Sequence, residues 1–177
     1  MSRVPFPDPP AAHVAKVLSR LPDLAIFRMI GHADSAFIPW LRFGAVLLEP
    51  GGFDPRLREI AILRVARLTP GADYEWTQHA AIARQTGVSD DLLAALESED
   101  DSPFDADARL VLALTEQVVR DAAPDDETLA AFLDRFSPAE LIHLVLVIGQ
   151  YMMVGRVMAT TGLLPEPAIG LDALRPS

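Results

Sequence analysis

The segment from Pro55 to Val88, which reads PRLREIAILRVARLTPGADYEWTQHAAIARQTGV, constrains the fold more than any other part of the chain. Asp54 before Pro55 is a helix start, because an aspartate caps free backbone amides and a proline suits the first helical position. A Thr-Pro-Gly turn at 69–71 separates this helix from a second one, which Gly87 can end. The pattern predicts a helical hairpin over residues 55–88.

The first helix of this hairpin is apolar nearly all the way around, which is typical of a central, buried helix. Its apolar positions are Leu57, Ile60, Ala61, Ile62, Leu63, Val65, Ala66 and Leu68. Arg64 projects into the middle of the strongest apolar stripe of this helix. Because an unpaired buried charge is strongly destabilising, Arg64 needs a partner.

The rest of the chain also predicts helices, and the fold class is all-α. No alternating run long enough for a β-sheet occurs in the 177 residues, and Leu and Ala dominate over β-branched residues. Ser137-Pro138-Ala139-Glu140 predicts the start of a last long helix that runs to about residue 161. The length fits a single domain over 1–177, with an extended Pro-rich arm at 1–10 and a Pro-rich tail at 165–177.

Composition excludes several classes of function. The formal net charge of −10 disfavours nucleic acid and anionic membranes as partners. The absence of cysteine excludes disulfides, thiolate catalysis and zinc–thiolate sites. The N-terminus lacks the layout of a signal peptide, which predicts a cytoplasmic protein. The most apolar stretch, 141–161, contains His143, Gln150 and Arg156, so we expect a buried core helix rather than a membrane span.

Glu75 and His79 are the first candidates for chemistry. They are four residues apart, so they are neighbours on one face of the second hairpin helix. A carboxylate beside an imidazole orients the ring and raises its pKa, which suits proton transfer near neutral pH. The alternative is an ordinary helix pair, with Glu75 favoured in the first turn by the helix dipole.

Three charged residues of the first hairpin helix have two interpretations each. Arg64 and Arg67 either bind a substrate carboxylate through their forked guanidinium groups or pair with Glu59, Glu75 or a carboxylate of a neighbouring subunit. Glu59 is either a buried acid with a raised pKa, suited to proton relay, or half of a structural ion pair.

Two aromatic residues flank Glu75. Tyr74 and Trp76 either fill the core or line a substrate pocket. Tyr74 is the better candidate for substrate binding, because its hydroxyl can donate a hydrogen bond to an anion.

Metal and cofactor sites are weakly indicated. Glu75, His79 and His143 could supply ligands, but nothing in the sequence fixes the third ligand, and His143 fits a core position. The acidic stretch 97–107 lacks the spacing of a calcium loop and is expected to be solvated. No nucleotide-binding motif is present. We therefore predict no metal and no cofactor.

The segments LREIAILRVARL, DYEWTQHAAIARQTGV and LVLVIGQYMMVGRVMATTGL together resemble the carboxymuconolactone decarboxylase family, which includes AhpD-like alkylhydroperoxidase proteins. The resemblance covers roughly residues 40–165, and the hairpin is its most specific part. It implies an all-helical AhpD-like fold built around the hairpin, and self-association into trimers or hexamers.

The resemblance also bears on the chemistry. The peroxidase branch of the family carries a Cys-x-x-Cys pair, a histidine four residues after the second cysteine, and an upstream glutamate. With that histidine aligned on His79, the cysteine positions fall on Ala72 and Glu75, and Glu59 lies within a residue of the upstream glutamate. Both thiols are absent, which excludes thiol-dependent peroxide reduction. The decarboxylase branch also lacks the cysteine pair and tends to carry Glu-x-x-x-His, as Glu75 and His79 do.

The sequence and the resemblance together predict cofactor-free proton-transfer chemistry, of decarboxylase or lactone lyase type, on a small anionic molecule. His79 is the expected acid and base, Glu75 its orienting partner, and Arg64 or Arg67 the anchor for a substrate carboxylate. The alternative is a non-catalytic oligomeric scaffold or small-molecule binder that has lost AhpD-type redox activity. An enclosed pocket that contains His79 and an arginine would favour the enzyme.

Overall fold

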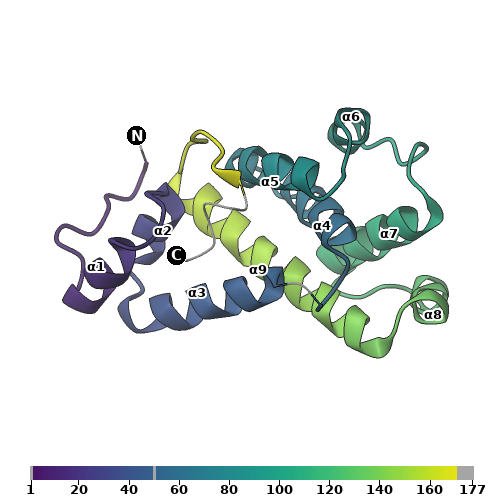
Figure 1. Cartoon of the computed structure of the whole chain (residues 1–177), viewed down its shortest axis with the longest axis horizontal. Coiled ribbons are helices and arrows are strands. Elements are labelled where there is room, and N and C mark those ends of the chain that lie inside the picture. Colours follow the sequence, from purple (N-terminus) through teal and green to yellow (C-terminus); the bar gives the residue numbers. More distant parts are fainter. Residues whose placement is uncertain (1, 50, 171–177) are drawn as a thin grey trace.

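The computed structural model of the chain describes residues 2–49 and 51–170, and within them it contains nine α-helices (Figure 1). These are α1 (Ala12–Leu18), α2 (Ala25–Ile30), α3 (Asp34–Leu48), α4 (Pro55–Leu68), α5 (Asp73–Gln85), α6 (Asp90–Ser98), α7 (Ala106–Asp121), α8 (Asp126–Arg135) and α9 (Pro138–Thr161). The all-α prediction is confirmed for the part of the chain described.

The predicted hairpin is formed by α4 and α5. The Asp54 side chain accepts a hydrogen bond from the Leu57 amide at 2.9 Å, with Pro55 in the first turn of α4. Gly71 in the connecting turn has φ +81° and Gly87 after α5 has φ +98°, values at which a side chain would strain the backbone. The local signals in the sequence therefore set both ends of the hairpin.

Helix α4 lies at the centre of the molecule, between α5, α7 and α9 (Figure 1). Every residue of α4 from Leu57 to Ala66 is buried, as expected for a helix that is apolar all round. Ile60 and Leu63 of α4 pack with Leu112 of α7 and Ile148 of α9 in the main hydrophobic cluster.

Helix α9 spans the molecule diagonally and has one buried face (Figure 1). It begins with the predicted capping box, formed by the side chains and backbone of Ser137 and Glu140. Its length and apolar composition alone would also suit a membrane span. Val147 and Val154 point into the protein, whereas Ile142 and Leu146 are exposed.

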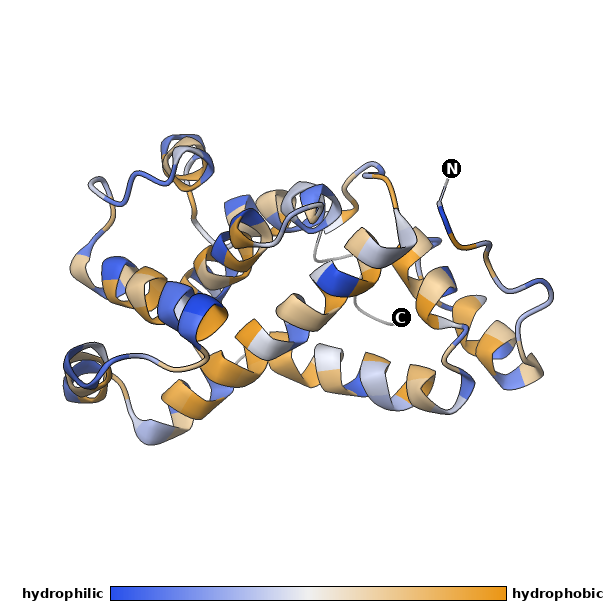
Figure 2. Ribbon diagram, turned by 180° about the vertical axis from the view of Figure 1, so that it is seen from behind, coloured by the Kyte–Doolittle hydropathy of each residue, from blue (hydrophilic) through white to orange (hydrophobic). Residues whose placement is uncertain are grey.

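The exposed side of α9 forms part of an uncovered apolar surface. Hydrophobic residues follow one another along the first half of α9 (Figure 2), and Phe43 and Val46 of α3 are exposed as well. The trimer or hexamer expected from the family resemblance stays a prediction, and this is a surface that such an assembly could bury.

The two terminal segments pack on the chain itself. In the N-terminal arm, the Arg3 amide donates to the Thr161 carbonyl at 2.6 Å, and His32 Nε2 lies 2.8 Å from the Pro5 carbonyl oxygen. At the other end, Glu166 Oε1 accepts a hydrogen bond from the Ala25 amide at 2.8 Å. Residues 163–170 therefore form a strap across α2 and α5, called the C-terminal strap below; the remainder of the predicted tail, 171–177, lies outside the described residues.

Arg64 is buried and joins three parts of the fold. Its guanidinium forms an ion pair with Asp101, in the loop after α6, and a second with Glu116 of α7 at 2.9 Å. The acidic stretch 97–107 is thus not wholly solvated, because Asp101 forms an ion pair with Arg64 of α4. Neither carboxylate is one of the partners expected for Arg64 from the sequence.

We predict that Arg64→Leu lowers the free energy of unfolding by about 1–3 kcal/mol, because it removes the charge that holds Asp101 and Glu116 over α4. The loss stays below that of a fully buried pair, since both carboxylates are partly exposed to water. The matched control is Arg67→Leu: Arg67 is exposed over the Trp76 ring, and its loss should cost less than about 1 kcal/mol. Equal losses in urea denaturation would contradict this assignment.

Candidate functional site

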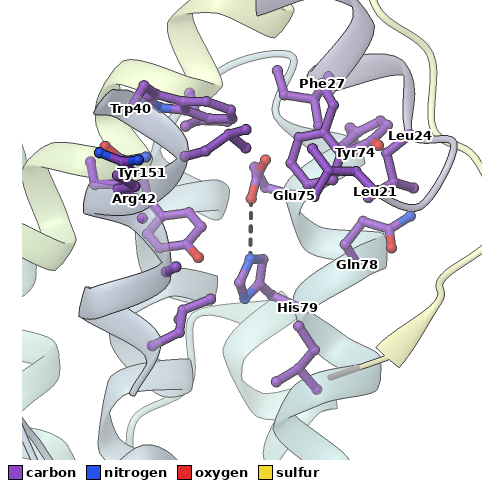
Figure 3. Close-up of a pocket in the computed structure, with 18 residues that line it drawn as sticks. Leu21, Leu24, Phe27, Trp40, Arg42, Tyr74, Glu75, Gln78, His79 and Tyr151 are labelled. Carbon is purple, nitrogen blue, oxygen red and sulfur yellow. Dashed lines mark ion pairs between the residues drawn. The ribbon is translucent and has the colours of Figure 1, made fainter. Parts of the chain in front are cut away.

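A cavity of about 330 Å³ lies between α2, α3, α5 and α9 (Figure 3). Most of its lining is apolar and includes Leu24, Phe27, Trp40, Leu48, Ile82 and Val154. The polar side chains come mainly from two helices: α5 contributes Glu75, Gln78 and His79, and α9 contributes Gln150 and Tyr151. Arg42 of α3 also lines the cavity and is exposed to solvent. The site thus suits a mainly apolar molecule with a few polar groups.

His79 is held between two carboxylates. Its Nδ1 atom lies 2.7 Å from Glu59 Oε2, and its Nε2 atom lies 3.4 Å from Glu75 Oε2. Glu75 and His79 line the cavity from successive turns of α5, whereas Glu59 reaches the ring from α4 and is fully buried. The sequence predicted the Glu75–His79 pair; the packing of α4 against α5 adds Glu59 on the other side of the ring.

Arg58 is one residue of this cluster that the sequence motifs do not indicate. Its side chain is 1% exposed and its Nε atom lies 3.3 Å from Glu59 Oε1. Its Nη1 atom has no hydrogen-bond partner among the described residues. Arg58 thus provides a buried positive charge beside the Glu59 carboxylate. Its place next to Glu59 on an all-round apolar helix was a signal available in the sequence.

The pKa values of Glu75 and His79 are both raised. Burial raises the pKa of Glu75, the charge of Glu59 raises it further, and His79 opposes the change. Burial by itself would lower the pKa of His79, but the charge of Glu59, its hydrogen bond to the ring and the charge of Glu75 raise it overall. The two groups therefore hold protons to higher pH than usual, which suits proton exchange at a site near neutral pH.

Tyr151 lies against the other side of this cluster. Its ring meets the His79 ring edge to face, with 4.6 Å between the centroids. Burial and the charges of Glu59 and Glu75 raise the pKa of the Tyr151 hydroxyl, so it stays protonated. We did not propose Tyr151 for the site from the sequence, because its apolar neighbours in α9 give no local signal of chemistry.

Tyr74 and Trp76 have other contacts. The Tyr74 ring lines the cavity, but its hydroxyl donates to Glu166 of the C-terminal strap and so is not free to bind an anion. Trp76 packs against the main cluster and lies beneath the Arg67 guanidinium, 5.9 Å from its ring centroid. Trp76 does not line the cavity, and neither do Arg64 and Arg67.

The three residues considered as metal ligands are not brought together. The His143 ring stands over Gly52, and its Nε2 atom lies 3.2 Å from the Leu47 carbonyl oxygen. In the described part of the chain, no group of three or more His, Asp and Glu side chains is arranged to hold a metal ion.

Comparison with known proteins finds a match to the family that the sequence motifs resemble. Residues 36–117 match the model of the carboxymuconolactone decarboxylase family, a segment that includes α4, α5 and the residues of the His79 cluster on them. No curated protein gives a significant match.

Solved structures share the fold at low sequence identity. A protein from Ralstonia eutropha JMP134, described as an alkylhydroperoxidase AhpD core and an uncharacterized peroxidase-related protein, has a TM-score of 0.74 at 17% identity, over 93% of this chain and 92% of that one. An uncharacterized peroxidase-related protein from Silicibacter sp. TM1040 has a TM-score of 0.73 at 18% identity, over 92% and 87%. An Agrobacterium tumefaciens protein of unknown function, linked by name to AhpD antioxidant defence, has a TM-score of 0.69 at 18% identity, over 77% and 94%. These likenesses show an AhpD-like fold.

The raised pKa values of Glu75 and His79 predict that stability falls as pH rises. The folded protein keeps protons that the unfolded chain releases above the ordinary pKa values of 4.5 and 6.5. The free energy of unfolding should therefore decline from about pH 5 upward, until Glu75 is ionised and His79 is neutral in the folded protein as they are in the unfolded chain.

Urea denaturation at a series of pH values measures this decline, which should be smaller in Glu75→Gln and in His79→Gln than in the wild type. The control is Glu127→Gln, a change at an exposed carboxylate of α8, which should keep the wild-type slope. A stability that is flat or rises over this range in the wild type would contradict the assignment.

Proposed function

We propose that the protein catalyses cofactor-free proton transfer, of decarboxylase or lactone lyase type, on a small molecule; the match of residues 36–117 to the carboxymuconolactone decarboxylase family model and the absence of cysteine support this proposal. The substrate has an apolar body and one anionic group. The observation that carries the proposal is the His79 ring, held by buried Glu59 and facing the cavity beside Glu75.

The roles of the two carboxylates follow from the ring atoms that they contact. Glu59 at Nδ1 fixes the orientation of the ring and stabilises the imidazolium, as buried carboxylates do behind catalytic histidines. Glu75 lies on the Nε2 side, where the substrate enters. His79 Nε2 and Glu75 thus form the pair that exchanges a proton with substrate, and Glu59 is the orienting partner, a role that we expected of Glu75 from the sequence.

The anchor for the anionic group is Arg42 in this proposal. Arg64 is already paired with two carboxylates and Arg67 lies over Trp76, so neither faces the cavity. Arg42 lines the cavity, and no ion pair occupies it among the described residues. A guanidinium there offers the forked donors that a carboxylate needs. The cavity is partly open to solvent rather than enclosed, and its lining by both His79 and an arginine is what supports the enzyme over a scaffold that has lost its site.

For a β-keto acid, the bond between the carboxylate carbon and the α-carbon breaks and CO₂ leaves. The electron pair of that bond moves onto the ketone oxygen and gives an enolate. The His79–Glu75 pair then delivers one proton to the α-carbon, which yields the ketone, and takes a proton back from solvent. For a lactone, the same pair removes a proton from the carbon next to the one that bears the ring oxygen, the C–H electron pair forms a C=C bond, and the ring C–O bond breaks with its electron pair on the carboxylate oxygen; the proton is then released to solvent. Both steps need acid–base groups in a mainly apolar cavity and no electron transfer.

The test is a screen of small lactones and β-keto acids with alkyl or aryl bodies, measured by CO₂ release and by loss of substrate. We expect His79→Ala to lower kcat/KM by about 10²–10⁴-fold, the range for loss of a general acid or base. His13→Gln is the matched control, because His13 is an exposed histidine of α1 paired with Asp34, and it should keep wild-type activity.

Two further results bear on the roles of single residues. Arg42→Gln should raise KM for carboxylate substrates and leave neutral lactones unaffected. Turnover by His79→Ala at the wild-type rate would overturn the proposal, whatever substrate the screen finds.

A further inference from the structure

Two polar side chains of the cavity have no role in the function proposed above. Tyr151 and Gln150 are consecutive residues of α9 that line the cavity together with the Glu75–His79 pair of α5. In Figure 3 the Tyr151 hydroxyl points toward the interior of the site, to the side of the line that joins Glu75 and His79.

The hydroxyl of Tyr151 has no hydrogen-bond partner among the residues that the structure describes, although its ring is packed against His79 and the core. Gln150 is 5% exposed, and its Oε1 atom likewise has no partner in that part of the chain. Buried polar groups ordinarily find partners, so the buried Gln150 oxygen requires an explanation, and beside it the half-buried Tyr151 offers a free hydroxyl to the same cavity.

The same cavity provides an internal comparison. Its other tyrosine, Tyr74, donates its hydroxyl to Glu166. Its other glutamine, Gln78, donates to the carbonyls of Glu166 and Pro167, and its Oε1 atom accepts from the Ile169 amide. The C-terminal strap thus provides hydrogen-bond partners for Tyr74 and Gln78. Tyr151 and Gln150 on α9 remain available to a ligand.

We propose that the Tyr151 hydroxyl, with the Gln150 amide beside it, binds the carbonyl oxygen of the substrate, on which negative charge develops in the reaction. The ligand class is a mainly apolar carbonyl compound whose oxygen faces α9 and whose reacting carbon faces His79 and Glu75. This inference rests on the proposed function, because it uses the same cavity and the same acid–base pair.

The chemistry of the hydroxyl suits this role. Because burial and the nearby carboxylates keep Tyr151 protonated, it is a donor throughout the neutral range. Glu75 by contrast can only repel an enolate once it is ionised. A preorganised donor aimed at the developing oxyanion is ordinarily among the largest contributions to the rate of such reactions. The Gln150 amide can donate to the same oxygen or accept from the enol.

The probe is 2-naphthol, an apolar planar molecule with one enol-like oxygen, and its matched control is 2-methylnaphthalene, in which a methyl group replaces that oxygen. Fluorescence titration of both ligands into wild type and Tyr151→Phe forms a cycle that isolates the contact between the two hydroxyls. Phenylalanine keeps the ring packing, and 2-methylnaphthalene reports whether the variant still has an intact cavity.

We expect Tyr151→Phe to weaken 2-naphthol binding by about tenfold and 2-methylnaphthalene binding by less than about twofold, as for loss of one buried hydrogen bond. Gln150→Leu should weaken 2-naphthol binding in the same selective way. Equal effects of Tyr151→Phe on both ligands, or none on either, would overturn the inference while leaving the His79 proposal intact, because activity of His79→Ala tests that separately. Failure of both ligands to bind the wild type at millimolar concentration would overturn the inference and remove the support that the cavity gives to the proposed function.

Discussion

The pairing of buried charges between α4 and α5 is the constraint on which the site depends. Glu59 and Arg58 are inaccessible to water and His79 is nearly so. An ionised group in that environment is stable only with a partner at hydrogen-bond distance, and His79 Nδ1 lies 2.7 Å from Glu59. Any slip of α5 along α4 would break the contact between His79 and Glu59 and leave Arg58 as the only charged partner of that carboxylate among the described residues. Charge pairing therefore adds to apolar packing in fixing how the hairpin closes, and it fixes the direction in which His79 faces.

The buried charged residues of α4 have two different roles. Arg64 and its two carboxylates connect α4 to the loop after α6 and to α7, and its partners are in contact with water. Glu59 and Arg58 lie where no solvent reaches, behind a histidine that lines a cavity. The first arrangement holds parts of the fold together. The second is the kind in which pKa values shift toward the range where protons are exchanged.

The absence of cysteine gives the site its chemical character. In alignment with the peroxidase branch, Glu75 takes the position of the second cysteine, one turn before His79. A carboxyl group exchanges protons but not electrons, which agrees with the acid–base chemistry proposed for this site. The apolar walls from α2, α3 and α9 then decide which molecules enter, and the polar end decides how they are oriented.

The sequence by itself determined the helices and the centre of the fold, because caps, glycine turns and apolar periodicity are local signals that act within a few residues. It also placed Glu75 beside His79, since a four-residue spacing on a helix makes them neighbours. Only the tertiary structure decided the rest of the site: Glu59 on the far side of the ring, Tyr151 against it, and Arg64 outside the cavity. Together with the contact between Tyr74 and Glu166, these contacts join residues that lie 20 to 92 positions apart in the chain. Such distances are set by how helices pack, and no local pattern reports them.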